Sequence, residues 1–232
     1  VVFSGRQSSG FYYNDILLLS NAAYHTGLVV KNCTFQNGSA GIYVWRTVTP
    51  FMGGHQYIDN MFTNFYAGAI FSNVTDGLVI RRNVMTSSST GISAGVNIAN
   101  NIGDFRFEKN RLNLTGGQST QAPGLYLQAR SSTNPGAPLV ANNFIRVTGT
   151  LWGIRCANTS NTKVFHNTVY SDGWTSATMG VPLRVEGSTV GMSFNNNIFY
   201  AASGQSAALD MNTTSAFSSL DYNTVYTAGS VI

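Results

Sequence analysis

A short pattern of apolar and polar residues recurs along the whole chain. Segments such as "VVKNCTF", "YIDNMF" and "VIRRNVM" each hold two or three polar residues between two apolar positions. The last residue of each polar group forms one column: Cys33, Asn60, Asn83, Asn110, Asn143, Asn167, Asn197 and Asn223. Neighbours in this column are 23 to 33 residues apart. A repeat of this length indicates a solenoid, in which each repeat packs on the next.

Apolar residues flank the column at fixed distances. Three residues before it stand Val30, Tyr57, Ile80, Phe107, Val140, Val164, Phe194 and Leu220. Two residues after it stand Phe35, Phe62, Met85, Leu112, Ile145, Val169, Phe199 and Val225. Because side chains alternate between the faces of a strand, these positions predict two short strands on either side of a polar corner. Stacked Asn side chains can bond to one another and to turn backbone there.

A third apolar segment follows a variable loop in each repeat. These segments read "DILLLS", "GIYVW", "AIFSN", "GISAG", "GLYLQ", "GIRCA", "PLRVE" and "ALDMN". Three short strands per repeat, each paired with its equivalent one repeat away, predict an all-β parallel β-helix of about eight coils with three parallel sheets and an Asn ladder. Rungs of such a stack lie about 4.8 Å apart.

The repeats "VVKNCTF", "PLVANNFI", "VFHNTVY" and "FNNNIFYAA" resemble those of right-handed parallel β-helix proteins of the pectate-lyase-like superfold. The closing "LDYNTVY" also resembles the last coils of such regions in large secreted or cell-surface bacterial proteins. The resemblance implies a single β-helix domain over residues 1–232 and an extracellular or cell-surface location. Both ends of the repeats lack a polar cap, so we expect a segment of a longer protein whose neighbouring domains are partners.

Composition narrows the expected partners. Charged residues make up 9% of the chain, with a formal net charge of +4. The basic residues are scattered along the sequence, which disfavours a nucleic-acid partner, and no apolar run reaches the length of about 18 residues needed to span a membrane. Cys33 and Cys156 are expected about four rungs, roughly 19 Å, apart. That is too far for a disulfide, so two free, buried thiols are expected.

The third strand of each repeat presents two outward columns of side chains. From the second coil onward the first column reads Tyr43, Phe71, Ser93, Tyr126, Arg155, Arg184 and Asp210. The second column reads Trp45, Asn73, Gly95, Gln128, Ala157, Glu186 and Asn212. This face is therefore expected to change from aromatic to charged along the axis.

We expect this face to bind polysaccharide. The expected binding residues carry aromatic, amide and guanidinium groups: Tyr43, Trp45, Phe71, Tyr126, Gln128, Arg155 and Arg184. Aromatic side chains can stack on sugar rings. Two guanidinium groups one rung apart suit the carboxylates of an acidic polysaccharide.

An enzymatic alternative uses the same groove. Glu186 and Asp210 are expected on adjacent rungs, and glycoside hydrolysis uses a pair of carboxylates at such a separation. Arg155, Arg184, Glu186 and Asp210 are therefore the candidate catalytic residues of a polysaccharide lyase or glycoside hydrolase. The acidic clusters and motifs of the superfold's enzymes are absent. We expect no metal site and no cofactor, with Ca²⁺ implied by the resemblance alone.

Two structural interpretations stay open beside these. The face can be an ordinary ladder of exposed strand residues with weak surface ion pairs, or the chain can be an architectural stalk of a surface protein.

The long loops at 113–124 and 170–181 precede third strands, and Trp152 and Trp174 are placed where they can reach over the groove.

Overall fold

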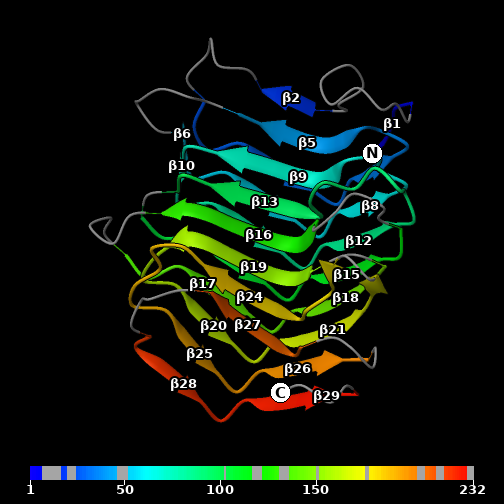
Figure 1. Cartoon of the computed structure of the whole chain (residues 1–232). Coiled ribbons are helices and arrows are strands. Elements are labelled where there is room, and N and C mark those ends of the chain that lie inside the picture. Colours follow the sequence, from blue (N-terminus) through cyan, green and yellow to red (C-terminus); the bar gives the residue numbers. More distant parts are fainter. Residues whose placement is uncertain are drawn as a thin grey trace.

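The chain winds into a parallel β-helix with three sheets. The computed structural model describes residues 1–6, 17–19, 25–45, 52–101, 103–116, 122–130, 136–149, 152–175, 178–202, 207–212 and 217–228. Figure 1 shows the coils stacked from the blue N-terminal strands to the red C-terminal strands. The fold expected from the repeat is confirmed. Among the described residues there is no helix long and apolar enough to cross a membrane.

The three main sheets contain nine, eight and eight strands, and within each sheet the neighbouring strands are parallel. The first sheet precedes the Asn column and contains β3 (Val29–Lys31), β7 (Gln56–Ile58), β11 (Val79–Arg81), β14 (Arg106–Glu108), β17 (Leu139–Ala141), β20 (Lys163–Phe165), β25 (Ser193–Asn195) and β28 (Ser219–Asp221). The second sheet follows the column and contains β1 (Val2–Ser4), β4 (Thr34–Gln36), β8 (Met61–Thr63), β12 (Val84–Ser87), β15 (Arg111–Leu114), β18 (Phe144–Thr148), β21 (Thr168–Asp172), β26 (Ile198–Ala201) and β29 (Thr224–Thr227).

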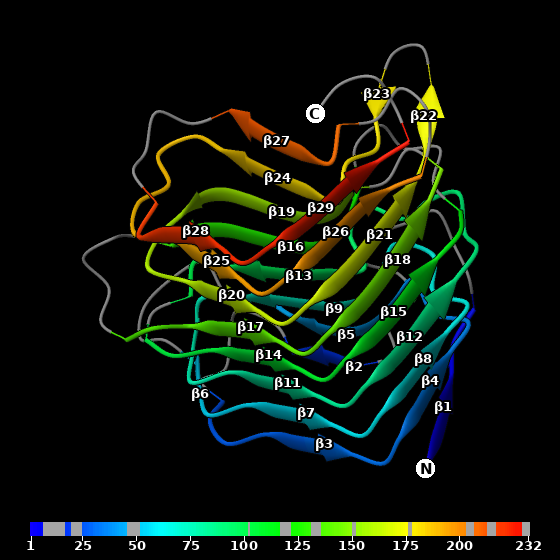
Figure 2. The same ribbon diagram turned by 90° about the horizontal axis from the view of Figure 1, so that it is seen from below.

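The third sheet carries the expected binding face. It contains β2 (Leu17–Leu19), β5 (Ala40–Val44), β9 (Gly68–Asn73), β13 (Val96–Ala99), β16 (Pro123–Arg130), β19 (Trp152–Thr159), β24 (Leu183–Glu186) and β27 (Leu209–Asn212). Two small pairs lie outside the main sheets: β6 (Met52–Gly53) with β10 (Thr75–Asp76), and β22 (Trp174–Thr175) with β23 (Thr178–Met179). Figure 2 shows the first and second sheets meeting at a sharp bend that runs along the stack.

The core is one column of apolar side chains between the three sheets. The flanking residues predicted to point inward are buried in every coil except the last, where Leu220 and Val225 are 47% and 38% exposed. Aromatic rings of successive coils stack in this core. The rings of Phe35 and Phe62, for example, have centroids 5.0 Å apart and are nearly parallel. Period-two alternation in three strands per coil therefore produces a continuous core.

The asparagine column forms a hydrogen-bonded ladder at the bend between the first two sheets. The Asn143 Oδ1 atom accepts the backbone N–H of Asn110 at 2.9 Å, and its Nδ2 donates to the Phe107 carbonyl at 2.9 Å. The same two bonds recur from Asn60 through Asn223, with the acceptor one coil away in each case. Cys33 opens the column and donates its backbone N–H to the Asn60 Oδ1 atom. Buried polar groups at the bend are thereby satisfied.

The residue before each ladder position has the left-handed backbone conformation. Its φ lies between 53° and 57° at Asn32, Asp59, Arg82, Lys109, Asn142, His166, Asn196 and Tyr222. Asn and Asp tolerate this conformation, whereas Arg, Lys, His and Tyr rarely adopt it. The sharp corner requires it, and the ladder bonds on the next residue stabilise it. His166, which the pattern places at a corner, lies there.

One strand of the third sheet lies later in the sequence than expected. The sequence pattern predicts "GISAG", residues 91–95, as this strand, but β13 begins at Val96, which pairs with Ile70 and Leu125. Both segments alternate apolar and polar residues, so the pattern alone could not separate them. The outward residues are therefore Asn97 and Ala99, and the expected positions of Ser93 and Gly95 are wrong.

Both cysteines are free, as expected, but only one is fully buried. Cys156 lies inside β19 with no exposed surface, whereas Cys33 is half-buried. Cys33 stands at the corner of an early coil and its thiol donates to the Lys31 carbonyl at 3.3 Å. The expectation of two buried thiols is wrong for Cys33, because it stands in the first coil of the column; Asn60 and Asn83, at the same corner of later coils, are buried.

Replacing a central ladder residue is expected to destabilise the fold. Asn143→Ala leaves the buried Asn110 N–H and the Phe107 carbonyl without their partners, which should lower the free energy of unfolding by about 3 kcal/mol. Urea unfolding followed by circular dichroism measures this. The exposed Asn212→Ala is the matched control and should change stability by less than about 0.5 kcal/mol. Equal effects of the two substitutions would contradict a structural role for the ladder.

The two thiols should differ sharply in reactivity. Burial raises the pKa of Cys156 to about 12, so its reactive thiolate is scarce at neutral pH. Iodoacetamide should therefore modify one thiol of the folded protein, Cys33, and both thiols in denaturant. Mass spectrometry of wild type and of Cys33→Ser checks this assignment. Rapid labelling of the folded Cys33→Ser variant would contradict the burial of Cys156.

Candidate functional site

The outer face of the third sheet brings the expected site residues into one column. Adjacent strands pair Tyr43 with Phe71, Tyr126 with Arg155, Arg155 with Arg184, and Arg184 with Asp210. Asn97 fills the position between Phe71 and Tyr126. The parallel in-register pairing explains this alignment, since each outward residue stands directly beside its equivalent one coil away.

The aromatic end of this column is closed. Tyr43 and Phe71 are only 3% and 2% exposed, and they pack with Ala40, Ala67 and Ala94 in a small cluster outside the main core. Their rings lie 5.7 Å apart, and Trp45 stacks on Tyr43 at 5.6 Å. Neither Tyr43 nor Phe71 presents a free ring face for a sugar. Trp45 and Tyr126 are half-buried and keep part of their surface at the edge of this cluster.

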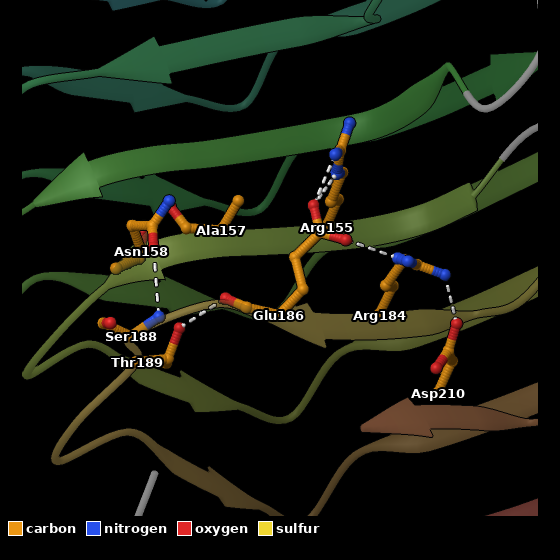
Figure 3. Close-up of polar contacts among 9 residues, drawn as sticks. Arg155, Ala157, Asn158, Arg184, Glu186, Ser188, Thr189 and Asp210 are labelled. Carbon is orange, nitrogen blue, oxygen red and sulfur yellow. Dashed lines mark hydrogen bonds and ion pairs between the residues drawn. The ribbon is translucent and has the colours of Figure 1, made fainter. Parts of the chain in front are cut away.

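The later coils carry a connected chain of charges. Arg155 donates from Nε to the Glu186 Oε1 atom at 2.7 Å and also donates from Nη2 to the same oxygen. Arg184 donates from Nε to the Glu186 Oε2 atom at 2.7 Å and from Nη1 to the Asp210 Oδ2 atom. Figure 3 shows Glu186 between the two arginines and Asp210 at the end of the row. We call Arg155, Arg184, Glu186 and Asp210 the charged row.

Aromatic rings support the two arginines. The guanidinium carbons of Arg155 and Arg184 lie 4.7 and 4.6 Å from the centroid of the Trp152 ring. Arg155 also lies 4.6 Å from the Tyr126 ring centroid. Trp152 is buried, so it forms a floor beneath the arginines and does not reach over the groove as expected. Cation–π contacts and paired charges together hold the arginines in place.

The two arginines of the charged row keep the Glu186 carboxylate ionised. Burial by itself would raise the pKa of Glu186, but hydrogen bonds from Arg184 and Arg155 outweigh burial and hold that pKa below its ordinary value. Burial also raises the pKa of the Tyr126 hydroxyl. The row therefore offers donors and acceptors in a balanced pattern with no net charge.

Amide side chains continue the polar surface toward the earlier coils. The Gln128 Nε2 atom donates to the Asn97 Oδ1 atom at 3.1 Å, one rung away. On the neighbouring rungs Asn100 donates to the Asn73 Oδ1 atom at 2.7 Å. Gln128 therefore lies beside Tyr126 and the charged row, as expected, within a surface of amides and paired charges.

The geometry does not favour acid–base catalysis by Glu186 and Asp210. A glycosidase needs one protonated carboxyl and free space for the glycosidic bond between its two carboxylates. Here Glu186 is held ionised, and the Arg184 guanidinium bridges Glu186 and Asp210. Calcium does not fit either, because both Glu186 oxygens accept from arginine, and no group of three or more potential His, Cys, Asp or Glu ligands occurs among the described residues.

Sequence reasoning missed the roles of Trp152 and Asn97. Trp152 begins the same strand that carries Arg155, which is a usable signal because it stands directly before "GIRCA". Asn97 was missed because β13 was placed too early. Trp174 and the tip of the 170–181 loop lie at β22 and β23, where the side chains fall outside the described residues, as does the 117–121 part of the other loop.

No protein-family model matches the chain, and no curated protein matches it. Solved structures do show similarity. They include DFA-IIIase from Arthrobacter chlorophenolicus A6 in complex with GF2, with a TM-score of 0.40 and 10% identity over 88% of this chain and 60% of that one. The chain thus spans about 60% of that structure's length.

Two further structures share this degree of similarity. The C387A mutant of the same DFA-IIIase with DFA-III gives a TM-score of 0.44 and 9% identity over 99% of this chain and 76% of that one. The Agl-KA catalytic domain gives 0.29 and 12% identity over 87% and 48%. Likenesses this weak carry no argument about function. The parallel β-helix is established by the chain's own strand pairing.

Neutralising Glu186 should weaken stability in a pH-dependent way. Because the pKa of Glu186 is lowered by folding, its ionised form adds stability above the ordinary pKa of about 4.5, and that stability is lost as pH falls below it. Glu186→Gln should therefore unfold at lower urea than wild type at pH 7, by about 1–2 kcal/mol after allowance for solvent screening.

The difference between wild type and Glu186→Gln should shrink at pH 3.5. Glu108→Gln is the matched control, because the 3.5 Å contact of Glu108 with Arg106 is longer and Arg106 is 57% exposed. A pH-independent difference for Glu186→Gln would show that its ion pairs do not stabilise the fold.

Proposed function

We propose that this chain is a polysaccharide-binding β-helix module of an extracellular or cell-surface protein. Its binding surface is the outer face of the third sheet from Trp45 to Asp210. The observation that carries the proposal is the charged row with its Trp152 floor, which places half-buried, fully paired charges on neighbouring rungs of a chain that is only 9% charged. On an ordinary solvent-exposed strand face, charged side chains stay exposed and are not paired in this way.

The surface supports recognition of sugar hydroxyl groups better than recognition of acidic sugars. Arg155 and Arg184 are already paired with Glu186 and Asp210, so a carboxylate ligand has to compete with these partners. Paired guanidinium and carboxylate groups still have free lone pairs and N–H groups for neutral hydroxyls. Tyr126 and Trp45 at the edge of the row supply ring surface for a sugar.

Binding is favoured over hydrolysis or elimination. The candidate catalytic roles of Arg155, Arg184, Glu186 and Asp210 would need an unpaired acid or base, and the four side chains bond to one another instead. A scaffold role without ligand remains the structural alternative, and a binding assay decides between the two.

Removal of a ring from this face should weaken glycan binding. Tyr126→Ala is expected to lower the affinity for an uncharged polysaccharide found on a glycan array by about tenfold, the value of one stacking contact of about 1.4 kcal/mol. Affinity electrophoresis in gels containing that polysaccharide measures the change. Tyr200→Ala on the second sheet is the control and should bind like wild type. Failure of the wild type to bind any uncharged glycan would overturn the proposal in favour of a scaffold.

A further inference from the structure

Most of the exposed cations lie away from the third sheet. The first sheet, its corner and the start of the adjoining strands of the second sheet hold seven cationic side chains: Lys31, Arg81, Arg82, Arg106, Lys109, Arg111 and Lys163. Three anionic side chains, Asp59, Glu108 and Asp221, share this region. The net charge here is therefore +4, which equals the formal charge of the whole chain, whereas the charged row of the third sheet is neutral. We call this region the basic corner.

The cations cluster because of the corner conformation. Asp59, Arg82 and Lys109 occupy the left-handed position on three successive coils, so their side chains project from the same edge. Arg82 donates from Nε and Nη2 to the two Asp59 oxygens at 2.6 and 2.8 Å. This bond, together with the nearby charges of Lys31 and Arg81, lowers the pKa of Asp59. One arginine thus binds this carboxylate and two further cations lie near enough to act on it, which shows the kind of group that this corner attracts.

The surface beside these cations is apolar and not flat. The outward column at the start of the second sheet exposes Met61, Val84, Phe144 and Ile198, each between 39% and 47%. Arg111 lies over the exposed Phe144 ring with its guanidinium carbon 5.9 Å from the centroid. A hollow of about 300 Å³ opens at the early coils between Asp59, Arg82, Cys33 and Met61. Figure 2 shows this bend running along the stack between β3 and β4, β7 and β8, and β11 and β12.

We propose that the basic corner is a second binding surface, which takes a linear polysaccharide bearing carboxylate or sulfate groups. The cations face the charged groups of the polymer, and the exposed apolar column with Phe144 faces the C–H surface of its sugar rings. The surface is distinct from the charged row and does not depend on it.

Charge density favours a polysaccharide over a nucleic acid. Duplex DNA carries about one charge per 1.7 Å, far more than the few unpaired cations spread over six coils can match. A polysaccharide with one charged group per sugar unit has a spacing closer to that of the rungs, which are about 4.8 Å apart. The apolar column also has no counterpart in a phosphate backbone, whereas it suits a sugar ring.

The test compares two double variants with the same change of net charge. Lys31→Gln with Lys109→Gln removes two exposed cations from the basic corner, and Arg6→Gln with Arg146→Gln removes two exposed cations elsewhere. Binding to polygalacturonate, dextran sulfate, uncharged dextran and a short DNA duplex is measured by affinity electrophoresis at low and moderate salt. The corner variant should bind the charged polysaccharides about tenfold more weakly, and the control less than twofold more weakly.

Wild-type binding should also weaken as salt rises, because the screening length shortens from about 30 Å at 0.01 M to about 10 Å at 0.1 M. A preference for polygalacturonate or for dextran sulfate identifies the carboxylate or the sulfate as the recognised group. Equal losses in the two double variants, an equal loss of uncharged dextran binding in the corner variant, or tighter binding of DNA than of both polysaccharides would overturn the proposal. Tyr126→Ala should leave this binding unchanged, which separates the basic corner from the function proposed for the third sheet.

Discussion

The hydrogen bonds of the asparagine ladder are the constraint on which the rest of the structure depends. Each ladder Oδ1 atom accepts the backbone N–H of the coil before it, and each Nδ2 donates to a carbonyl of that same coil, from Asn60 to Asn223. These two bonds set the register between coils whatever the length of the intervening loops, which varies from coil to coil. Because one fixed corner per coil determines the strands on both sides, outward residues line up in columns, and the surfaces of this protein are therefore columns too.

The columns place charge in two contrasting ways. On the third sheet Arg155, Arg184, Glu186 and Asp210 bond to one another, so their fields cancel beyond a short distance. At the basic corner the cations outnumber the carboxylates, and only Asp59 forms a short bidentate pair. A balanced row gives local, directional contacts, whereas an excess of one sign acts over the screening length and attracts a charged polymer. The same fold thus offers two chemically different faces.

The sequence predicts the architecture well because the signal repeats. The Asn column, the flanking apolar positions and most of the outward columns follow from spacing and alternation alone. Features that depend on contacts between different strands and loops do not follow from spacing and alternation. "GISAG" and the true strand at Val96 alternate equally well, so only pairing with Ile70 and Leu125 separates them. The burial of Tyr43 and Phe71 depends on segments that pack over them, which a strand pattern cannot show.

The basic corner shows why scattered residues in a sequence can form one surface. Lys31, Arg82 and Lys109 are far apart along the chain. The sequence alone therefore gives no sign that they share one basic surface. The corner conformation gathers Arg82 and Lys109 on adjacent coils, and strand pairing brings Lys31 within range of Asp59. A rigid stack holds such groups in place before any ligand arrives, so little ordering entropy is lost when a polymer binds. In the proposed binding mode, repeated weak contacts on successive rungs act together, because each further sugar unit binds at a high effective concentration once the first is held.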